Sequence, residues 1–202
     1  ETRLVLIDLA KGRQRMAGSA LLQCWSAMGT AVPDLDDPDY LIGFFQLLQR
    51  AREQQLLLAY NDRSDGGLLA CLSEMAFASH CGLALDLTAL GPDLIAALFN
   101  EEPGVVVQVP ADRLEAFMAL GQTLNVALTE LGRPVQSADV VINHSGETHF
   151  RRSRSELQRI WSSTSHAIQR LRDNPSCADA EYDRLLDPTD PGQIKTQGRT
   201  QT

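Results

Sequence analysis

The 202-residue sequence lacks several features that would place it in a special class of protein. No run of consecutive apolar residues reaches the roughly 18 that a membrane-spanning helix needs. The start, ETRLVLIDLAKGRQR, does not follow the order of basic segment, long apolar segment and small-residue cleavage site of a secretory signal. We therefore predict no membrane partner and a cytoplasmic location.

Cysteine motifs and basic blocks are also missing. Cys24, Cys71, Cys81 and Cys177 show no CxxC spacing, so we expect buried free thiols rather than a zinc site or a disulfide framework, with Cys24 in the core and Cys177 in the tail. The net charge is −8, and the one basic stretch is HFRRSRSELQR at residues 149–159. A nucleic-acid partner would need a broader basic face, and we predict none.

What is present is the composition of an ordinary globular protein, with 44% hydrophobic and 22% charged residues. The length suits one large domain or two small ones. The first residue is Glu1 rather than methionine, so we expect the chain to be a piece of a longer protein.

Hydrophobic periodicity alternates between strand-like and helix-like segments, which predicts an α/β (α+β) fold with a layered mixed β-sheet and packed helices. We expect a glycine C-cap at Gly29, Pro92 in the first turn of its helix, and a closing meander of the last three strands around a turn at Ser145 and Gly146. The expected strands are residues 2–10, 56–60, 82–87, 104–110, 126–135, 138–146 and 147–153, and the expected helices are residues 18–29, 40–54, 66–79, 91–102, 111–125 and 153–172.

Three parts are expected along the chain: an α/β domain at 1–153, a helical extension at 154–186 and a flexible linker or tail at 187–202. The long helix of the extension carries an apolar stripe, which faces another domain of the parent protein or covers this domain's own core. The stripe consists of Leu157, Ile160, Trp161, Thr164, Ile168 and Leu171.

The stretch NDRSDGG, residues 61–67, joins an apolar strand to an apolar helix. Ligands of layered α/β folds bind at such strand ends, and paired glycines let the backbone approach a ligand. Asp62 could hold a magnesium ion shared with phosphates, and Ser64 could donate to a phosphate oxygen. The structural interpretation makes Ser64 or Asp65 a helix N-cap, and spacing alone favours it. A Walker A lysine and a nucleophile–base pair are both absent here.

Other polar groups have weaker patterns. Lys11, Arg13 and Arg15 precede a glycine-led helix, and an anion site and an exposed basic loop are equally good interpretations. Adjacent Glu101 and Glu102 diverge by about 100° on a helix, so a solvated helix end or an interdomain salt bridge is favoured over catalysis.

Histidine and cysteine neighbours form no convincing site. His80 and Cys81 are adjacent at a helix end without a third ligand, and we interpret both as structural. The remaining histidines are scattered among polar residues and suggest no catalytic triad; they are His144, His149 and His166.

Several motifs together carry a family resemblance. NDRSDGGLLACLSEMAF resembles the signature of the AIR synthase superfamily, whose C-terminal subdomains carry an HD-x-SDGGL corner. LVLIDLAKGRQRMAGSALLQ, IAALFNEEPGVVVQV and above all QRLRDNPSCADAE resemble the large, single-chain form of phosphoribosylformylglycinamidine synthase, or FGAR amidotransferase. The resemblance covers nearly the whole chain in the right order.

The resemblance implies a ligase of de novo purine synthesis that uses ATP and glutamine to make formylglycinamidine ribonucleotide. It further implies two tandem synthetase-like halves followed by a glutaminase domain, with this chain as the C-terminal subdomain of the second half. That half holds an auxiliary ADP with magnesium, so Asp62 is expected to bind the metal and Ser64 the nucleotide. No catalytic residue is expected here, and the partners are the synthetase-like N-terminal subdomains and the glutaminase domain.

The sequence departs from the family pattern at a few positions. Asn61 replaces the usual His and cannot titrate, Ala10 replaces Gly, and Met16-Ala17 replace Leu-Gly. Two other hypotheses stay open: a structural interface module without nucleotide, and another ATP-dependent superfamily member such as a kinase or selenophosphate synthase. QRLRDNPSCADAE argues against the last of these.

Overall fold

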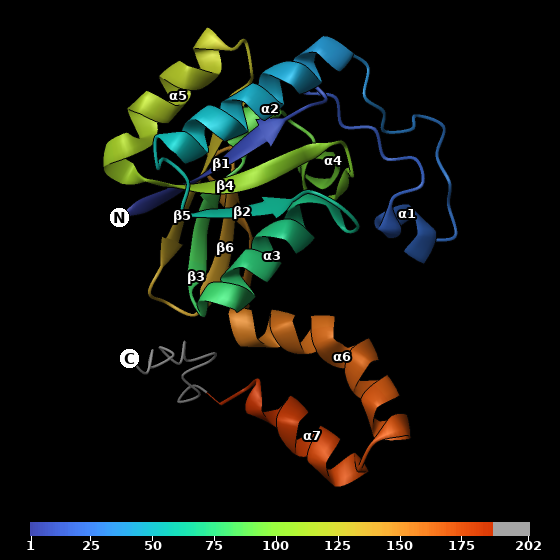
Figure 1. Ribbon diagram of the computed structural model, residues 1–202. Helices are drawn as coiled ribbons and strands as arrows, with labels where there is room; N and C mark the ends of the chain where they lie inside the picture. Colours follow the sequence, from blue (N-terminus) through green and yellow to red (C-terminus); the bar gives the residue numbers. More distant parts are fainter. Residues whose placement is uncertain (188–202) are drawn as a thin grey trace, which may run out of the picture. The chain divides into compact units, whose positions relative to one another are not determined.

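The computed structural model describes residues 1–187, and the chain divides into two compact units, Glu1–Arg154 and a second that begins at Ser155 (Figure 1). Apart from Asp187, the expected tail at 187–202 lies outside the described residues. None of the helices in the described part is long and apolar enough to cross a membrane.

Seven strands and seven α-helices make up the described chain. The strands are β1 (Thr2–Asp8), β2 (Ala59–Asp62), β3 (Gly82–Asp86), β4 (Gly104–Pro110), β5 (Leu128–Val135), β6 (Asp139–His144) and β7 (Glu147–Ser153). The helices are α1 (Ala20–Cys24), α2 (Pro38–Glu53), α3 (Gly67–Ser79), α4 (Leu94–Phe99), α5 (Leu114–Thr123), α6 (Arg154–Arg172) and α7 (Pro175–Arg184), with 3₁₀ turns η1 (Thr88–Leu90) and η2 (Ala111–Arg113).

The first unit is a seven-stranded mixed sheet in the order β2-β4-β1-β5-β3-β6-β7. All neighbours are antiparallel except β3 and β6, which are parallel. Helices α2 and α5 lie side by side on one face (Figure 1). The predicted α/β class with a mixed sheet and packed helices is confirmed.

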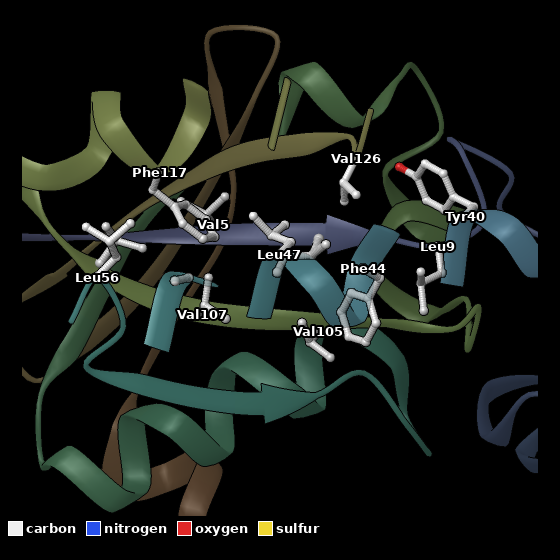
Figure 2. Packing of buried hydrophobic residues seen from close by; sticks show 13 residues of the cluster. Val5, Leu9, Tyr40, Phe44, Leu47, Leu56, Val105, Val107, Phe117 and Val126 are labelled. Carbon is white, nitrogen blue, oxygen red and sulfur yellow. The ribbon is translucent and has the colours of Figure 1, made fainter. Parts of the chain in front are cut away.

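The core forms because alternate residues of the central strands point to one face of the sheet. Val5 and Val107 lie beneath Leu47 of α2 and Phe117 of α5, and all four are fully buried (Figure 2). Burying such side chains contributes roughly 1.5–3 kcal/mol each. The packed sheet therefore forms a rigid platform for the loops at its edges.

At one end of the strands, the sheet brings together segments that are far apart in the sequence. Asp8, the last residue of β1, pairs with Gly104 at the start of β4, and Asp62, the last residue of β2, pairs with Val105. The two acidic residues therefore lie at the same end of the sheet, where β2 leads into the NDRSDGG corner.

Two predicted helices are too long. The expected helix 18–29 forms only as α1, which ends at a Trp25 C-cap rather than at Gly29. Trp25 and Met28 are 75% and 73% exposed, so no buried face extends the helix. The helix expected at 91–102 is reduced to α4, whose N-cap is Asp93, so Pro92 lies outside its first turn.

The predicted meander is wrong in part. Strands β6 and β7 do form a hairpin around Ser145 and Gly146, but β5 pairs with β1 and β3 instead of β6. Strand β3 lies between β5 and β6. Local turn signals could not reveal this insertion, because it depends on pairing between distant segments.

The second unit contains a helix hairpin of α6 and α7. Asn174 caps α7 by accepting from the backbone N–H groups of Ser176 and Cys177, which confirms that the helix before it ends at RDNP. Ile160, Ile168 and Leu171 of the expected apolar stripe are more than half exposed. Which partner covers this stripe stays a prediction.

Candidate functional site

The corner after β2 alternates exposed and buried side chains. Asp62 and Ser64 are exposed, whereas Arg63 between them is only 6% exposed. This alternation continues the period of two of the strand, so both predicted site residues lie on the outer side of the corner. Within the described residues, the Ser64 side chain makes no hydrogen bond and is available to a ligand.

Arg63 fixes the corner to the end of β1 and the start of β4. Its Nη2 atom lies 2.7 Å from Oδ1 of Asp8, and its Nε atom donates to the carbonyl oxygen of Glu102 at 2.7 Å. Its backbone N–H donates to the carbonyl oxygen of Gly104 at 2.8 Å. A Cβ on Gly104 would lie 3.0 Å from the guanidinium, so a glycine there makes room for Arg63. Sequence reasoning missed Arg63, because a charged residue in a polar loop gives no signal of burial.

The two glycines serve the turn into α3. Gly66 and Gly67 have φ angles of +84° and +68°, in the left-handed region that favours glycine. A Cβ on Gly67 would lie 2.7 Å from the carbonyl oxygen of Leu98 and 2.8 Å from that of Asn100. The pair therefore allows a left-handed turn and a close approach to the segment after α4.

The predicted N-cap at Ser64 or Asp65 is wrong. The N-cap of α3 is Gly66, which makes no side-chain cap hydrogen bond. Oε1 of Glu101 instead accepts from the N–H of Gly66 at 2.8 Å and from the N–H of Ala20, the first residue of α1, at 2.9 Å. A carboxylate from a distant segment thus accepts from the N-cap N–H at the positive end of α3, where a bound anion could otherwise accept.

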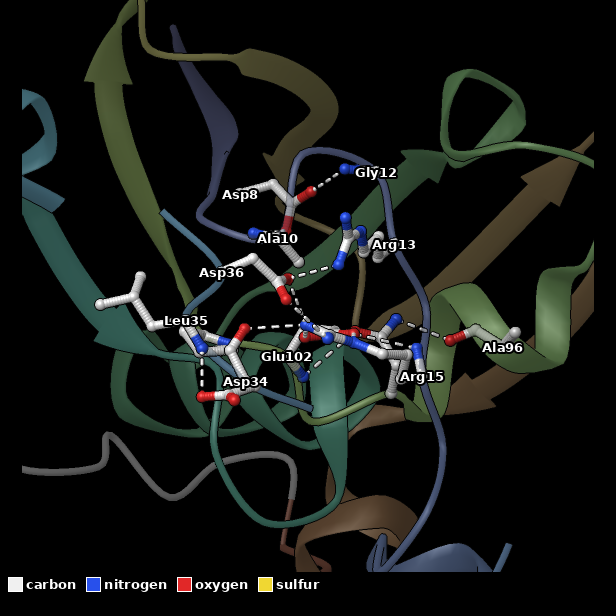
Figure 3. Close-up of polar contacts among 12 residues, drawn as sticks. Asp8, Ala10, Gly12, Arg13, Arg15, Asp34, Leu35, Asp36, Ala96 and Glu102 are labelled. Atoms are coloured by element: carbon white, nitrogen blue, oxygen red, sulfur yellow. Dashed lines mark hydrogen bonds and ion pairs between the residues drawn. The ribbon is translucent and has the colours of Figure 1, made fainter. Parts of the chain in front are cut away.

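Glu102 has a separate structural role. It is fully buried and accepts from Nε of Arg15 at 2.5 Å and from Nη2 of Arg15 at 2.8 Å (Figure 3). These bonds raise the pKa of Arg15, with the Asp36 carboxylate acting in the same direction. Both members of the pair belong to the first unit, so the expected solvated helix end and interdomain salt bridge are wrong for Glu102.

The basic loop at residues 11–15 is neutralised within the first unit. Lys11 pairs with Asp37 at 2.6 Å, and Arg13 pairs with Asp36 at 2.7 Å. Arg15 lies 2.9 Å from Asp36 and also donates to the carbonyl oxygen of Asp34 (Figure 3). The acidic stretch before α2 therefore holds the cations that were candidates for an anion site.

Asn61 connects the corner to α3. Its Nδ2 atom donates to the carbonyl oxygen of Cys71 at 3.1 Å, and Oε2 of Glu74 lies at 3.4 Å. Burial raises the pKa of the Cys71 thiol to about 12, so this cysteine stays protonated and unreactive. Asn61 thus has a structural role that needs no titration.

The histidines and cysteines that were considered as site residues occupy separate positions. His80 is the left-handed C-cap of α3, and His144 contacts the carbonyl oxygen of Gly91 through Nε2 at 2.7 Å. All four cysteines are free, but the prediction of buried thiols holds only for Cys71: Cys81 is half-buried, and Cys24 is exposed rather than in the core. Cys177 is exposed as well.

Asp62 has the chemistry to contribute one oxygen ligand to a hard cation. The hydroxyl of Tyr60 donates to its Oδ1 atom at 2.6 Å, and burial and this bond raise the pKa of Tyr60, so the hydroxyl keeps its proton. Across the described residues, no three His, Cys, Asp or Glu side chains gather as a metal site. A magnesium ion at Asp62 would therefore need further oxygen ligands from other groups, such as phosphates.

The first unit thus combines a mixed sheet, helices packed on it and a polar SDGG corner at the end of strand β2. Residues 9–144 match the family model of the AIR synthase related protein, C-terminal domain. The chain belongs to this family, and the match includes the corner, β4 and the neutralised basic loop.

Solved structures share the fold at low sequence identity. Thermotoga maritima PurL complexed with ATP has a TM-score of 0.62 and 10% identity over 77% of this chain and 25% of that chain. T. maritima PurL complexed with FGAR has a TM-score of 0.63 and 12% identity over 77% of this chain and 27% of that chain. E. coli HypE, a hydrogenase maturation protein, has a TM-score of 0.51 and 20% identity over 75% of this chain and 48% of that chain. The chain thus spans about a quarter of the length of the PurL chains it matches.

Proposed function

We propose that this chain is part of phosphoribosylformylglycinamidine synthase, the ligase that uses ATP and glutamine to convert formylglycinamide ribonucleotide to formylglycinamidine ribonucleotide. Its role is to support an auxiliary ADP–magnesium site and the packing of neighbouring domains, and the full active site lies elsewhere in the parent protein. The ordered motifs, the family membership and the PurL-like fold support this proposal.

One observation carries the site assignment. Asp62 and Ser64 are both exposed on a corner whose backbone is held by buried Arg63 and by Glu101. Proteins hold binding groups on fixed supports, because mobile groups lose conformational entropy when a ligand binds.

The two site residues have different tasks. A bound magnesium ion would neutralise phosphate charge and link it to a carboxylate. Asp62 supplies that carboxylate, and Ser64 donates its hydroxyl to a phosphate oxygen without adding charge. Glu101 occupies the N–H of Gly66, so this N–H is not a phosphate donor in the proposal.

A second candidate function is a structural interface module without nucleotide. One observation favours it: Oε1 of Glu101 already accepts from the N–H of Gly66, the N-cap of α3, so this N–H is not free for a phosphate. A third hypothesis, another ATP-dependent member of the superfamily, agrees with the HypE-like fold but leaves QRLRDNPSCADAE unexplained.

The test uses the full parent protein purified without added nucleotide, with bound ADP and magnesium measured by chromatography and metal analysis. We expect wild type to retain both and Asp62→Ala to retain about tenfold less, because one metal ligand is lost. Asp65→Ala is the matched control, since it removes an exposed carboxylate of the same corner. Wild-type protein without nucleotide would favour the interface module.

A further inference from the structure

Tyr60 and Asp62 share one face of β2, because residues two apart in a strand point to the same side. Both are exposed, and Tyr60 is 47% exposed. Strand β2 is the last strand at one end of the sheet order and pairs with β4. The two side chains therefore lie together on an edge strand that the packed β4 holds in register.

The hydroxyl of Tyr60 donates to Oδ1 of Asp62 at 2.6 Å. Within the described residues, Oδ2 of Asp62 accepts no hydrogen bond, so one carboxylate oxygen is held and the other is available. Asp65, an exposed carboxylate three residues further on, has no such support in the same part of the chain. The difference separates Asp62 from the other acidic residue of the corner.

We propose that Tyr60 is a positioning residue for the divalent cation: it orients the Asp62 carboxylate so that Oδ2 is presented as the ligand. This inference rests on the proposed function and extends it to a residue outside the NDRSDGG motif. Carboxylates that bind metals are commonly held by such hydrogen bonds, which fix their orientation before the ion arrives. A phenol hydroxyl suits the task, because it is neutral and its ring has only two side-chain torsions to order.

The experiment measures Mn²⁺ binding to the full parent protein in the presence of ADP by electron paramagnetic resonance. We expect Tyr60→Phe, which keeps the ring and removes the hydroxyl, to weaken Mn²⁺ binding about tenfold, the low end for loss of a group that supports a metal ligand. Tyr182→Phe is the control, because it removes a tyrosine hydroxyl that donates to the carbonyl oxygen of Arg159, a contact within the second unit. Circular dichroism melting shows that each variant is folded.

A double variant separates positioning from a general structural effect. If Tyr60 acts through Asp62, Tyr60→Phe has no additional effect on Mn²⁺ binding in the Asp62→Ala background. An equal loss in both backgrounds would overturn the inference, as would wild-type affinity in Tyr60→Phe while Asp62→Ala has lost binding. Wild-type protein that binds neither Mn²⁺ nor ADP would overturn the proposed function itself, and the inference with it.

Discussion

Buried charges at single positions hold the corner and the segments around it together. Glu102 is fully buried against Arg15, and Arg63 is buried against Asp8. A buried pair is weak evidence for stability, but removal of one partner leaves an uncompensated charge. Neither pair could be predicted from the sequence, because acidic and basic residues 50 to 90 positions apart carry no local pattern.

Glu102→Ala should therefore destabilise the protein by about 3 kcal/mol, the usual cost of breaking a buried ion pair from one side. Urea denaturation of the protein, followed by a probe in the first unit, measures the change. Asp36→Ala is the comparison, because its carboxylate is 38% exposed, and it should cost less than about 1 kcal/mol. Similar losses for the two variants would contradict the buried role of Glu102.

At the scale of elements, the sequence predicted the strongly patterned segments well. β4, α2 and α3 lie where periodicity placed them, because each buries a continuous apolar face. The prediction failed where burial and pairing depend on distant segments: α1 is short, and β5 lies away from β6. In the site, Asp62 and Ser64 were singled out from the motif, whereas Glu101, Arg63 and Tyr60 gain meaning only from their contacts.

The turn into α3 offers a test at this scale. Gly67→Ala combines a left-handed φ of +68° with contacts below 3.0 Å to backbone atoms of Leu98, Phe99 and Asn100. We expect a loss of about 3 kcal/mol, from conformational strain together with steric overlap.

The matched control is Gly12→Ala, at a φ of +82° but with no atom within 4 Å of the added Cβ. It should show the strain alone, about 1 kcal/mol. Thermal melting of both variants gives the difference. Equal losses would mean that the close approach of Gly67 to the segment after α4 is unimportant.

At the scale of the whole molecule, the two units are stabilised differently. The first has an apolar core, whereas polar and aromatic contacts join α6 to α7. The Tyr182 ring stacks on His166 with centroids 4.0 Å apart, and the Arg159 guanidinium lies 4.3 Å from the same ring. His166 and Arg170 both contact Asp179.

Tyr182→Ala should accordingly speed amide hydrogen exchange in α6 and α7 about tenfold, because the stacking and cation–π contacts together contribute roughly 1–2 kcal/mol. Amides of β1 and β4 should keep their rates. Mass spectrometry of exchanged peptides measures both sets. Tyr182→Phe retains the ring and should change the rates less; equally fast exchange in this variant would assign the effect to the hydroxyl.

The strand order also has a consequence for biosynthesis. β1 pairs with β4 and β5, β2 pairs with β4, and β3 pairs with β5 and β6. During translation from the N-terminus, no two strands of this sheet can therefore pair before β4 emerges from the ribosome. At roughly 5–20 residues per second, the apolar β1 strand stays without a partner for several seconds. In that interval its protection depends on the ribosome exit tunnel and on chaperones rather than on the fold.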